Sequence, residues 1–93
     1  MIKIVRFSRK ALKQLPSVPQ RILDKLETWV RAVELDGLER VRRIPGYHDE
    51  PLKGRRLGER SVRLSRSYRA IYEIKSDPSV EFVSIEEVSK HEY

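Results

Sequence analysis

One amphipathic pattern constrains the fold of this chain more than any other feature. Its apolar residues recur on one face of a helix with a period of 3.6 residues, at Ile22, Leu26, Trp29, Val30 and Val33. Asp36-Gly37 marks the end of the helix, because glycine commonly follows the last helical turn. A helix with a single apolar face has to bury that face, so we expect Trp29 in the core.

The segments on either side of this helix predict a strand and further helical turns. Residues 2–7 are β-branched and alternate imperfectly, which predicts a first strand. Ser8 is expected to cap a short helix. Ser17 is expected to cap the long helix, with Pro19 tolerated in its first turn. The apolar residues between 38 and 44 indicate one or two further helical turns.

The C-terminal half predicts three more strands. Residues 46–54 are polar and rich in turn-forming residues, and we interpret them as a loop. Strands are expected over residues 60–64, 68–74 and 80–85, with a turn at 76–79. The order strand, helix, helix, strand, strand, strand predicts an α+β fold in which two N-terminal helices pack on one face of a small antiparallel sheet. A chain of 93 residues forms one domain, 1–93.

Several classes of protein are excluded by composition. The chain has no cysteine, which excludes disulfides, thiol catalysis and cysteine-based metal sites. The two histidines, His48 and His91, lie far apart without ligand-spaced companions, and there is no glycine-rich phosphate loop, so we expect neither a metal nor a cofactor. No apolar run is long enough to span a membrane, and the charged N-terminus is no signal peptide. These features predict a soluble, cytoplasmic protein.

The positive charge is concentrated in the middle of the chain. The net charge is 20 − 14 = +6. Residues 40–69 hold ten Lys or Arg against three acids, whereas residues 73–93 hold two against six. A concentrated basic segment suits a polyanion partner, and arginine makes forked contacts to phosphate. The alternative is an ordinary solvated basic surface.

The side chains present are sufficient for cleaving RNA without a metal. That reaction uses the 2′-hydroxyl as nucleophile and needs a base, cations beside the phosphoryl oxygens and an acid for the leaving oxygen. Arg63 would face Arg69 across a hairpin if residues 65–67 form its loop, and facing like charges favour an anion between them. Both could equally be ordinary strand-surface arginines.

Two other segments could take part. Histidine is the side chain that titrates near neutral pH, and His91 lies with Tyr93 in a polar ending directly after an apolar strand. Lys53, Arg55 and Arg56 form a glycine-flanked cluster suited to backbone phosphates. The alternatives are a frayed tail and a solvated turn.

Three motifs make the chain resemble the RelE/ParE toxin superfamily, and HigB-like toxins in detail. Pro51-Leu52-Lys53-Gly54 is similar to a loop common in HigB-like toxins. Residues 60–72, with Tyr68-Arg69 followed by an apolar and aromatic strand, resemble the central hairpin of the family. The ending Lys90-His91-Glu92-Tyr93 resembles the family's C-terminal cluster. The order of elements agrees over the whole chain.

The resemblance implies a toxin that cuts mRNA in the ribosomal A site and is inhibited by a cognate, small DNA-binding antitoxin. It implies that Arg69 binds the scissile phosphate, with Arg63 beside it. His91 and Tyr93 would belong to the catalytic cluster. The cations expected to contact mRNA or ribosomal RNA are Lys53, Arg55, Arg56, Arg60 and Lys90.

The resemblance also leaves alternatives open. Ser61 stands where one branch of the superfamily has a functional lysine, and the final helix of some members is missing. The superfamily includes ParE-type toxins, which inhibit DNA gyrase and cut no RNA. A third interpretation is a module whose main role is to hold an acidic antitoxin segment that folds on binding. The His91/Tyr93 ending favours the ribonuclease.

Overall fold

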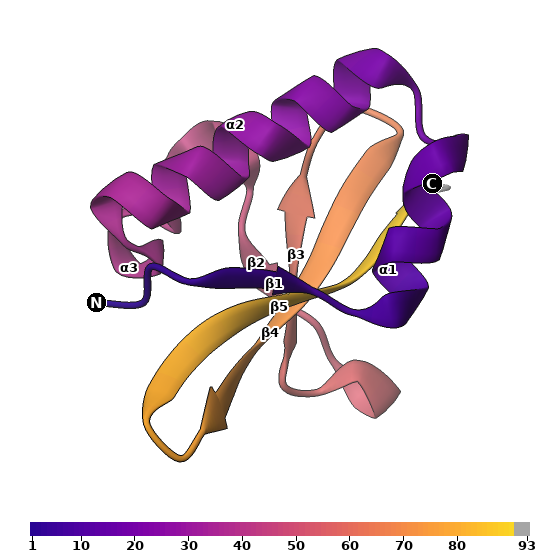
Figure 1. The fold of residues 1–93 in the computed structure, drawn as a ribbon. Coiled ribbons are helices and arrows are strands. Elements are labelled where there is room, and N and C mark those ends of the chain that lie inside the picture. The colour runs from indigo at the N-terminus through magenta and orange to yellow at the C-terminus, as the bar shows by residue number, and fades with distance from the viewer. Residues whose placement is uncertain (91–93) are drawn as a thin grey trace.

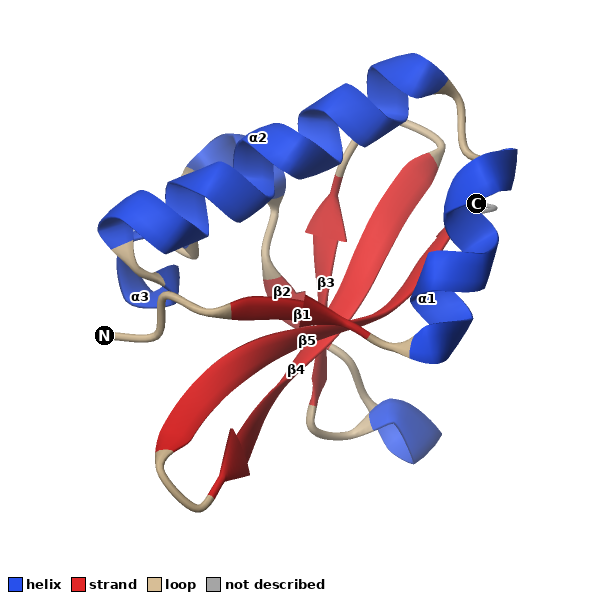
Figure 2. Ribbon diagram, viewed as in Figure 1, coloured by secondary structure: helices blue, strands red, loops and turns tan. Residues whose placement is uncertain are grey.

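Residues 1–90, which the computed structural model describes, form a five-stranded sheet with helices over one face (Figure 1). The order across the sheet is β1-β5-β4-β3-β2. The strands are β1 (Val5–Phe7), β2 (Glu50–Pro51), β3 (Glu59–Arg63), β4 (Tyr68–Asp77) and β5 (Val80–Lys90). The predicted fold class, helices packed on a small sheet in an α+β arrangement, is confirmed (Figure 2).

The helices begin and end largely where local signals place them. They are α1 (Arg9–Gln14), α2 (Gln20–Asp36) and α3 (Leu38–Val41), with one-turn 3-10 helices at Leu15–Ser17, Pro45–Tyr47 and Gly54–Arg56. Ser8 caps α1 as predicted, because its Oγ accepts a hydrogen bond from the Ala11 amide at 3.1 Å. No helix in residues 1–90 is long and apolar enough to cross a membrane.

The predicted cap of α2 at Ser17 is wrong. Ser17 ends a 3-10 turn, and α2 begins at Gln20 after Pro19. Val18 has an extended backbone because the ring of a following proline disfavours the helical conformation. A helix therefore cannot run through Val18 from Ser17.

The apolar face of α2 lies on the sheet and forms the centre of the core. Trp29 is fully buried, as predicted, and the centroid of its ring lies 5.4 Å from the ring centroid of Tyr72 on β4. Val62 on β3 and Ala70 on β4 belong to the same apolar cluster. These contacts fix which face of the β3–β4 hairpin points toward α2, and hence which face points away from it.

The sheet is mixed rather than purely antiparallel. β3, β4 and β5 form the predicted antiparallel series, but β1 pairs with β5 in parallel, with Val5 opposite Val83. A parallel pair needs a crossover connection, and the chain between β1 and β5 crosses the sheet face through α1 and α2 (Figure 1). The predicted all-antiparallel sheet is therefore wrong in this one pair.

A short edge strand lies inside the segment predicted to be a loop. Glu50 pairs with Ser61 and Pro51 pairs with Arg60, so that β2 extends the sheet beyond β3. Both residues of β2 are exposed, and proline is tolerated only on an edge strand because it has no N–H to donate. A two-residue strand without alternating apolar side chains leaves no pattern in the sequence.

Candidate active site at the end of the central hairpin

A small pocket lies where β2, β3 and β4 end together. Its volume is about 100 Å³, and its lining is formed by His48, Glu50, Leu52, Ser61, Arg63, Ser65, Tyr68 and Arg69. Two arginine side chains are among the residues that line this space, so it suits an anion such as a phosphate group.

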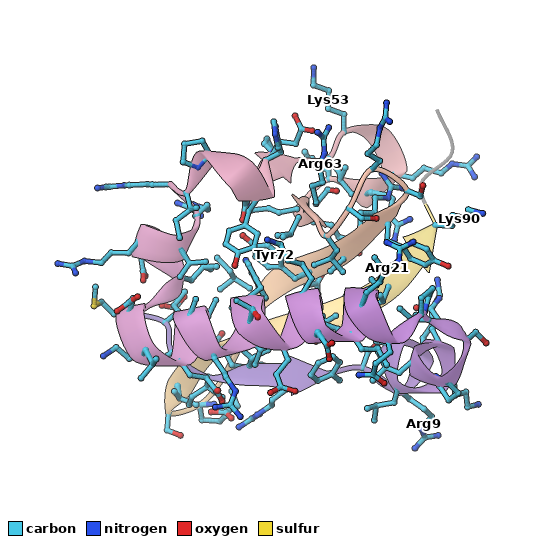
Figure 3. The ribbon with its side chains drawn as sticks, turned by 90° about the horizontal axis from the view of Figure 1, so that it is seen from above. Arg9, Arg21, Lys53, Arg63, Tyr72 and Lys90 are labelled. Carbon is cyan, nitrogen blue, oxygen red and sulfur yellow. The ribbon has the colours of Figure 1, made fainter. Side chains whose placement is uncertain are left out.

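Two arginines face each other in this pocket. Arg63 on β3 is the register partner of Arg69 on β4, as predicted from the length of the hairpin loop. They alternate along their strands with the buried residues Val62 and Ala70, which places them on the face away from α2. Figure 3 shows Arg63 on the β2–β3 side of the molecule, with Lys53 beyond it.

Neither pocket arginine is neutralised within the part of the chain that the structure describes. No ion pair among residues 1–90 includes Arg63 or Arg69. The Nε atom of Arg69 is buried and has no hydrogen-bond partner there. Buried polar groups are normally satisfied, and like charges placed opposite each other repel. The pocket therefore offers donors and positive charge to an anion.

Sequence reasoning missed the side chains on the other side of the pocket. His48 and Glu50 flank the start of β2, and Tyr68 begins β4. A carboxylate or an imidazole can accept a proton, so either residue could serve as a base beside the two arginines. The only signal for His48 and Glu50 in the sequence was a polar turn. Nothing in the pattern of that turn indicated that it lies next to the hairpin.

A buried carboxylate, that of Asp49, lies between His48 and Glu50 in the chain. Asp49 accepts hydrogen bonds of 2.6 Å from Tyr72 Oη and from Arg60 Nε, and its side chain is fully buried. Burial raises the pKa of Tyr72, and the bond to Asp49 raises it further, so the hydroxyl keeps its proton and donates it. Burial opposes the charge on Arg60, but the hydrogen bond to Asp49 and the negative charge of Asp49 together outweigh this effect and raise the pKa of Arg60.

This network changes the position expected for Arg60. It was predicted to contact RNA from the surface, but its Nε donates to the buried Asp49 and it does not line the pocket. No pattern in the sequence indicates this pairing, because Asp49 lies in a turn eleven residues before Arg60 and only the fold brings them together. Burial of an unpaired carboxylate is costly, and this pairing removes that cost.

A second carboxylate holds the basic loop 52–58. Arg56 Nε bonds to Glu59 at 2.9 Å, and its Nη2 bonds to Glu87 on β5 at 3.2 Å. Glu87 also accepts from Lys10 Nζ at 2.9 Å and from Ser89 Oγ at 2.7 Å. Burial opposes ionisation of Glu87, but these donors lower its pKa to about 2.

The other predicted cations are exposed. Lys53 and Arg55 lie on the loop held by Arg56, and neither takes part in an ion pair within residues 1–90. Lys90 ends β5 opposite the pocket residue Tyr68 (Figure 3). His91 and Tyr93, predicted to be catalytic, lie outside the described residues. Within residues 1–90 no cluster of three or more His, Cys, Asp or Glu side chains could hold a metal ion.

The mixed sheet, the helices over one face and the hairpin pocket together define a known class of fold. The chain has the fold of RelE/ParE-like toxins, which confirms the resemblance to that superfamily at the level of the fold. Neither the family models nor the curated proteins include a match to this chain. The likeness therefore rests on solved structures.

Three of these structures cover nearly the whole chain. A chain of the DinJ–YafQ toxin–antitoxin complex from E. coli has 18% identity over 98% of this chain and 94% of its own, with a TM-score of 0.73. A chain of the RelBE2 toxin–antitoxin complex from Mycobacterium tuberculosis has 27% identity over 98% and 100%, with a TM-score of 0.63. The YoeB/ParE toxin from Agrobacterium tumefaciens has 17% identity over 96% and 99%, with a TM-score of 0.68.

Proposed function

We propose that this chain is the toxin of a type II toxin–antitoxin module, an endoribonuclease that cuts mRNA in the ribosomal A site and so inhibits translation. The observation that carries the proposal is the facing pair Arg63 and Arg69, which lines a small pocket and joins no ion pair within residues 1–90. The toxin fold supports the same conclusion. A cytoplasmic location follows from the proposed substrate.

The chemistry proposed for the pocket is transfer of the phosphoryl group to the neighbouring 2′-hydroxyl. A base removes the hydroxyl proton, the 2′-oxygen bonds to phosphorus, and the bond to the 5′-oxygen breaks as that oxygen takes up a proton. Arg63 and Arg69 would stabilise the charge that develops on the phosphoryl oxygens. DNA lacks the attacking hydroxyl, so the reaction is specific for RNA.

The proton-transfer roles are divided between two groups of residues. His48 and Glu50 line the pocket and are the proposed sources of the base. His91 and Tyr93, which lie outside the described residues, are the proposed sources of the acid. They are also the proposed source of a surface that stacks on a nucleobase. This division keeps the two proton transfers on separate groups, as an in-line displacement requires.

The proposed nucleic-acid contacts lie around the pocket rather than in it. Lys53, Arg55 and Lys90 are exposed and would bind phosphates of mRNA or ribosomal RNA. Arg56 and Arg60 are bound to carboxylates, and we assign them to holding the loop and the sheet edge. On the ribosome, phosphates of ribosomal RNA would bind these exposed cations beside the mRNA and so complete the site.

The proposed protein partner is a cognate antitoxin, a small DNA-binding protein. Two of the three similar structures named above are toxin–antitoxin complexes, which supports this partner for the same fold. An antitoxin segment that folds on binding would contribute acidic side chains to a toxin with a net charge of +6. A genomic neighbourhood without such a gene would contradict this part of the proposal.

Primer extension on a reporter mRNA in a purified translation system tests the activity. Cuts that appear only while ribosomes translate, and that disappear in Arg69→Gln, are the expected result. Arg31→Gln is the matched control, because Arg31 is an exposed arginine on α2 whose partner Glu27 is also exposed. Intact mRNA with active toxin would overturn the proposal, and a supercoiling assay would then test a ParE-like inhibitor of gyrase.

A further inference from the structure

The pocket wall formed by residues 48–50 has little backbone structure of its own. β2 consists of two exposed residues, and Pro51 has no N–H to donate to the sheet. His48 has a φ of 45°, a left-handed conformation that costs free energy for a residue other than glycine. A conformation of this kind persists only when surrounding contacts hold it. The His48 amide donates to the Pro45 carbonyl at 3.0 Å, and side-chain contacts must supply the rest of the support for this wall.

Asp49 supplies those contacts from the opposite side of the segment. Its two donors, Arg60 and Tyr72, are register partners on β3 and β4, so one carboxylate joins both strands to the start of β2. Tyr72 is itself fixed by its contact with Trp29 of α2. The carboxylate therefore ties residues 48–50 to the most deeply buried part of the core.

We propose that Asp49 is a positioning residue that holds His48 and Glu50 in the pocket opposite Arg63 and Arg69. Asp49 is directed into the core, whereas the residues on either side of it line the pocket. Successive side chains at the start of a strand point in opposite directions, which explains the division between Asp49 and Glu50. The catalytic part of this inference rests on the proposed endoribonuclease, but the structural part does not.

Hydrogen exchange tests the structural part without any activity. The Leu52 amide donates to the Glu59 carbonyl at 2.9 Å and reports whether the segment stays on β3. Asp49→Asn and Tyr72→Phe should speed its exchange by about tenfold or more, beyond the change in global stability. Val33→Ala is the control, since it alters the buried face of α2 and should leave this local exchange unchanged. Equal protection of Leu52 in wild type and Tyr72→Phe would overturn the inference.

Single-turnover cleavage of ribosome-bound mRNA tests the catalytic part. Asp49→Asn should lower the rate constant at saturating toxin by about tenfold or more, while the half-saturating toxin concentration stays within about twofold. The triple variant with Asp49→Asn, His48→Ala and Glu50→Gln should cleave no more slowly than the double variant with His48→Ala and Glu50→Gln. This is expected because Asp49 acts through those two residues. Losses that multiply, or a wild-type rate in Asp49→Asn, would show that Asp49 does not position them.

The two tests separate failure of this inference from failure of the proposed function. If wild-type protein cuts no mRNA, the endoribonuclease is wrong, and the exchange of Leu52 alone decides whether Asp49 anchors the segment. If Asp49→Asn does not fold, Tyr72→Phe still tests the anchor, because it removes one donor and keeps the pair of Asp49 with Arg60.

Discussion

Arg63 and Arg69 are directly opposite each other on β3 and β4, and neither joins an ion pair within residues 1–90. Glu59 on β3 binds Arg56, and Asp49, just before β2, binds Arg60, so neither of these carboxylates pairs with Arg63 or Arg69. Facing like charges on a sheet are destabilising. A pair that is kept without neutralisation is typical of an anion-binding site, in which the ligand supplies the missing charge.

Removing one of these charges should stabilise the free protein and weaken its response to anions. For Arg69→Gln we expect a gain of about 0.2–1 kcal/mol at low salt, because the cross-strand repulsion disappears. Inorganic phosphate should raise the melting temperature of the wild type by binding the folded state, and should do so much less in the variant. Thermal unfolding with and without phosphate measures both effects.

Arg31→Gln provides the control for this experiment. Arg31 lies on α2 in an exposed pair with Glu27, and its removal lowers the net charge by the same amount. It should keep the full response to phosphate. An unchanged response in Arg69→Gln would mean that phosphate binds elsewhere and would remove the main support for the pocket as a phosphate site.

Local patterns predicted the parts of the fold that depend on residues close in sequence. The helical spacing of apolar residues located α2 and the burial of Trp29. Counting outward from the hairpin loop placed Arg63 opposite Arg69, because register within a hairpin follows from the loop. These predictions needed no knowledge of how distant segments meet.

Apart from the wrong cap at Ser17, the main features that were missed depend on distant contacts. The parallel pairing of β1 with β5 joins the two ends of the chain. Glu87 binds Arg56 across 31 positions, and nothing near Arg56 in the sequence indicates this second contact. His48 belongs to the pocket only because Asp49 folds the polar turn against β4. Charge counting therefore identified a basic surface but could not tell its free cations from its paired ones.

Free and paired cations should differ in their effect on the salt dependence of RNA binding. Each of Lys53→Gln and Arg55→Gln should reduce the slope of log K against log salt by about 0.7–1, because each removes one phosphate contact. Arg56→Gln should leave the slope nearly unchanged, since its guanidinium binds Glu59 and Glu87. Titrating a fluorescent single-stranded RNA at several salt concentrations measures the three slopes. A reduction of the slope in Arg56→Gln as large as that in Lys53→Gln would identify Arg56 as a direct phosphate contact.

The core on α2 should be sensitive to truncation on one face only. Leu26→Ala should lower the free energy of unfolding by about 2–5 kcal/mol, because Leu26 is buried against the sheet and the cavity would not refill. Leu35→Ala should change it by less than about 0.5 kcal/mol, because 73% of Leu35 is exposed. Urea unfolding of both variants measures the contrast. Equal losses would contradict the orientation of α2 on the sheet.

Glu87 should contribute to stability in a defined range of pH. Its pKa is lowered to about 2 in the folded protein, whereas an unfolded glutamate titrates near 4.3. A carboxylate whose folded pKa lies below its unfolded pKa stabilises the protein above the unfolded value, and that contribution is lost as the pH falls toward the folded value. Glu87→Gln should therefore cost about 2–3 kcal/mol at pH 7, given the size of the pKa shift.

The difference between wild type and Glu87→Gln should then shrink as the pH falls from about 5 to about 2, since protonation removes the same charge from the wild type. Urea unfolding at pH 7, 5 and 3 measures this difference, and taking it between variants cancels the titration of the other carboxylates. Glu81→Gln is the control, because Glu81 is exposed on the same strand and joins no ion pair within residues 1–90. A loss in Glu87→Gln that stays constant over this range would show that Glu87 stabilises the protein by packing rather than by its charge, and that Lys10 and Arg56 do not hold it ionised.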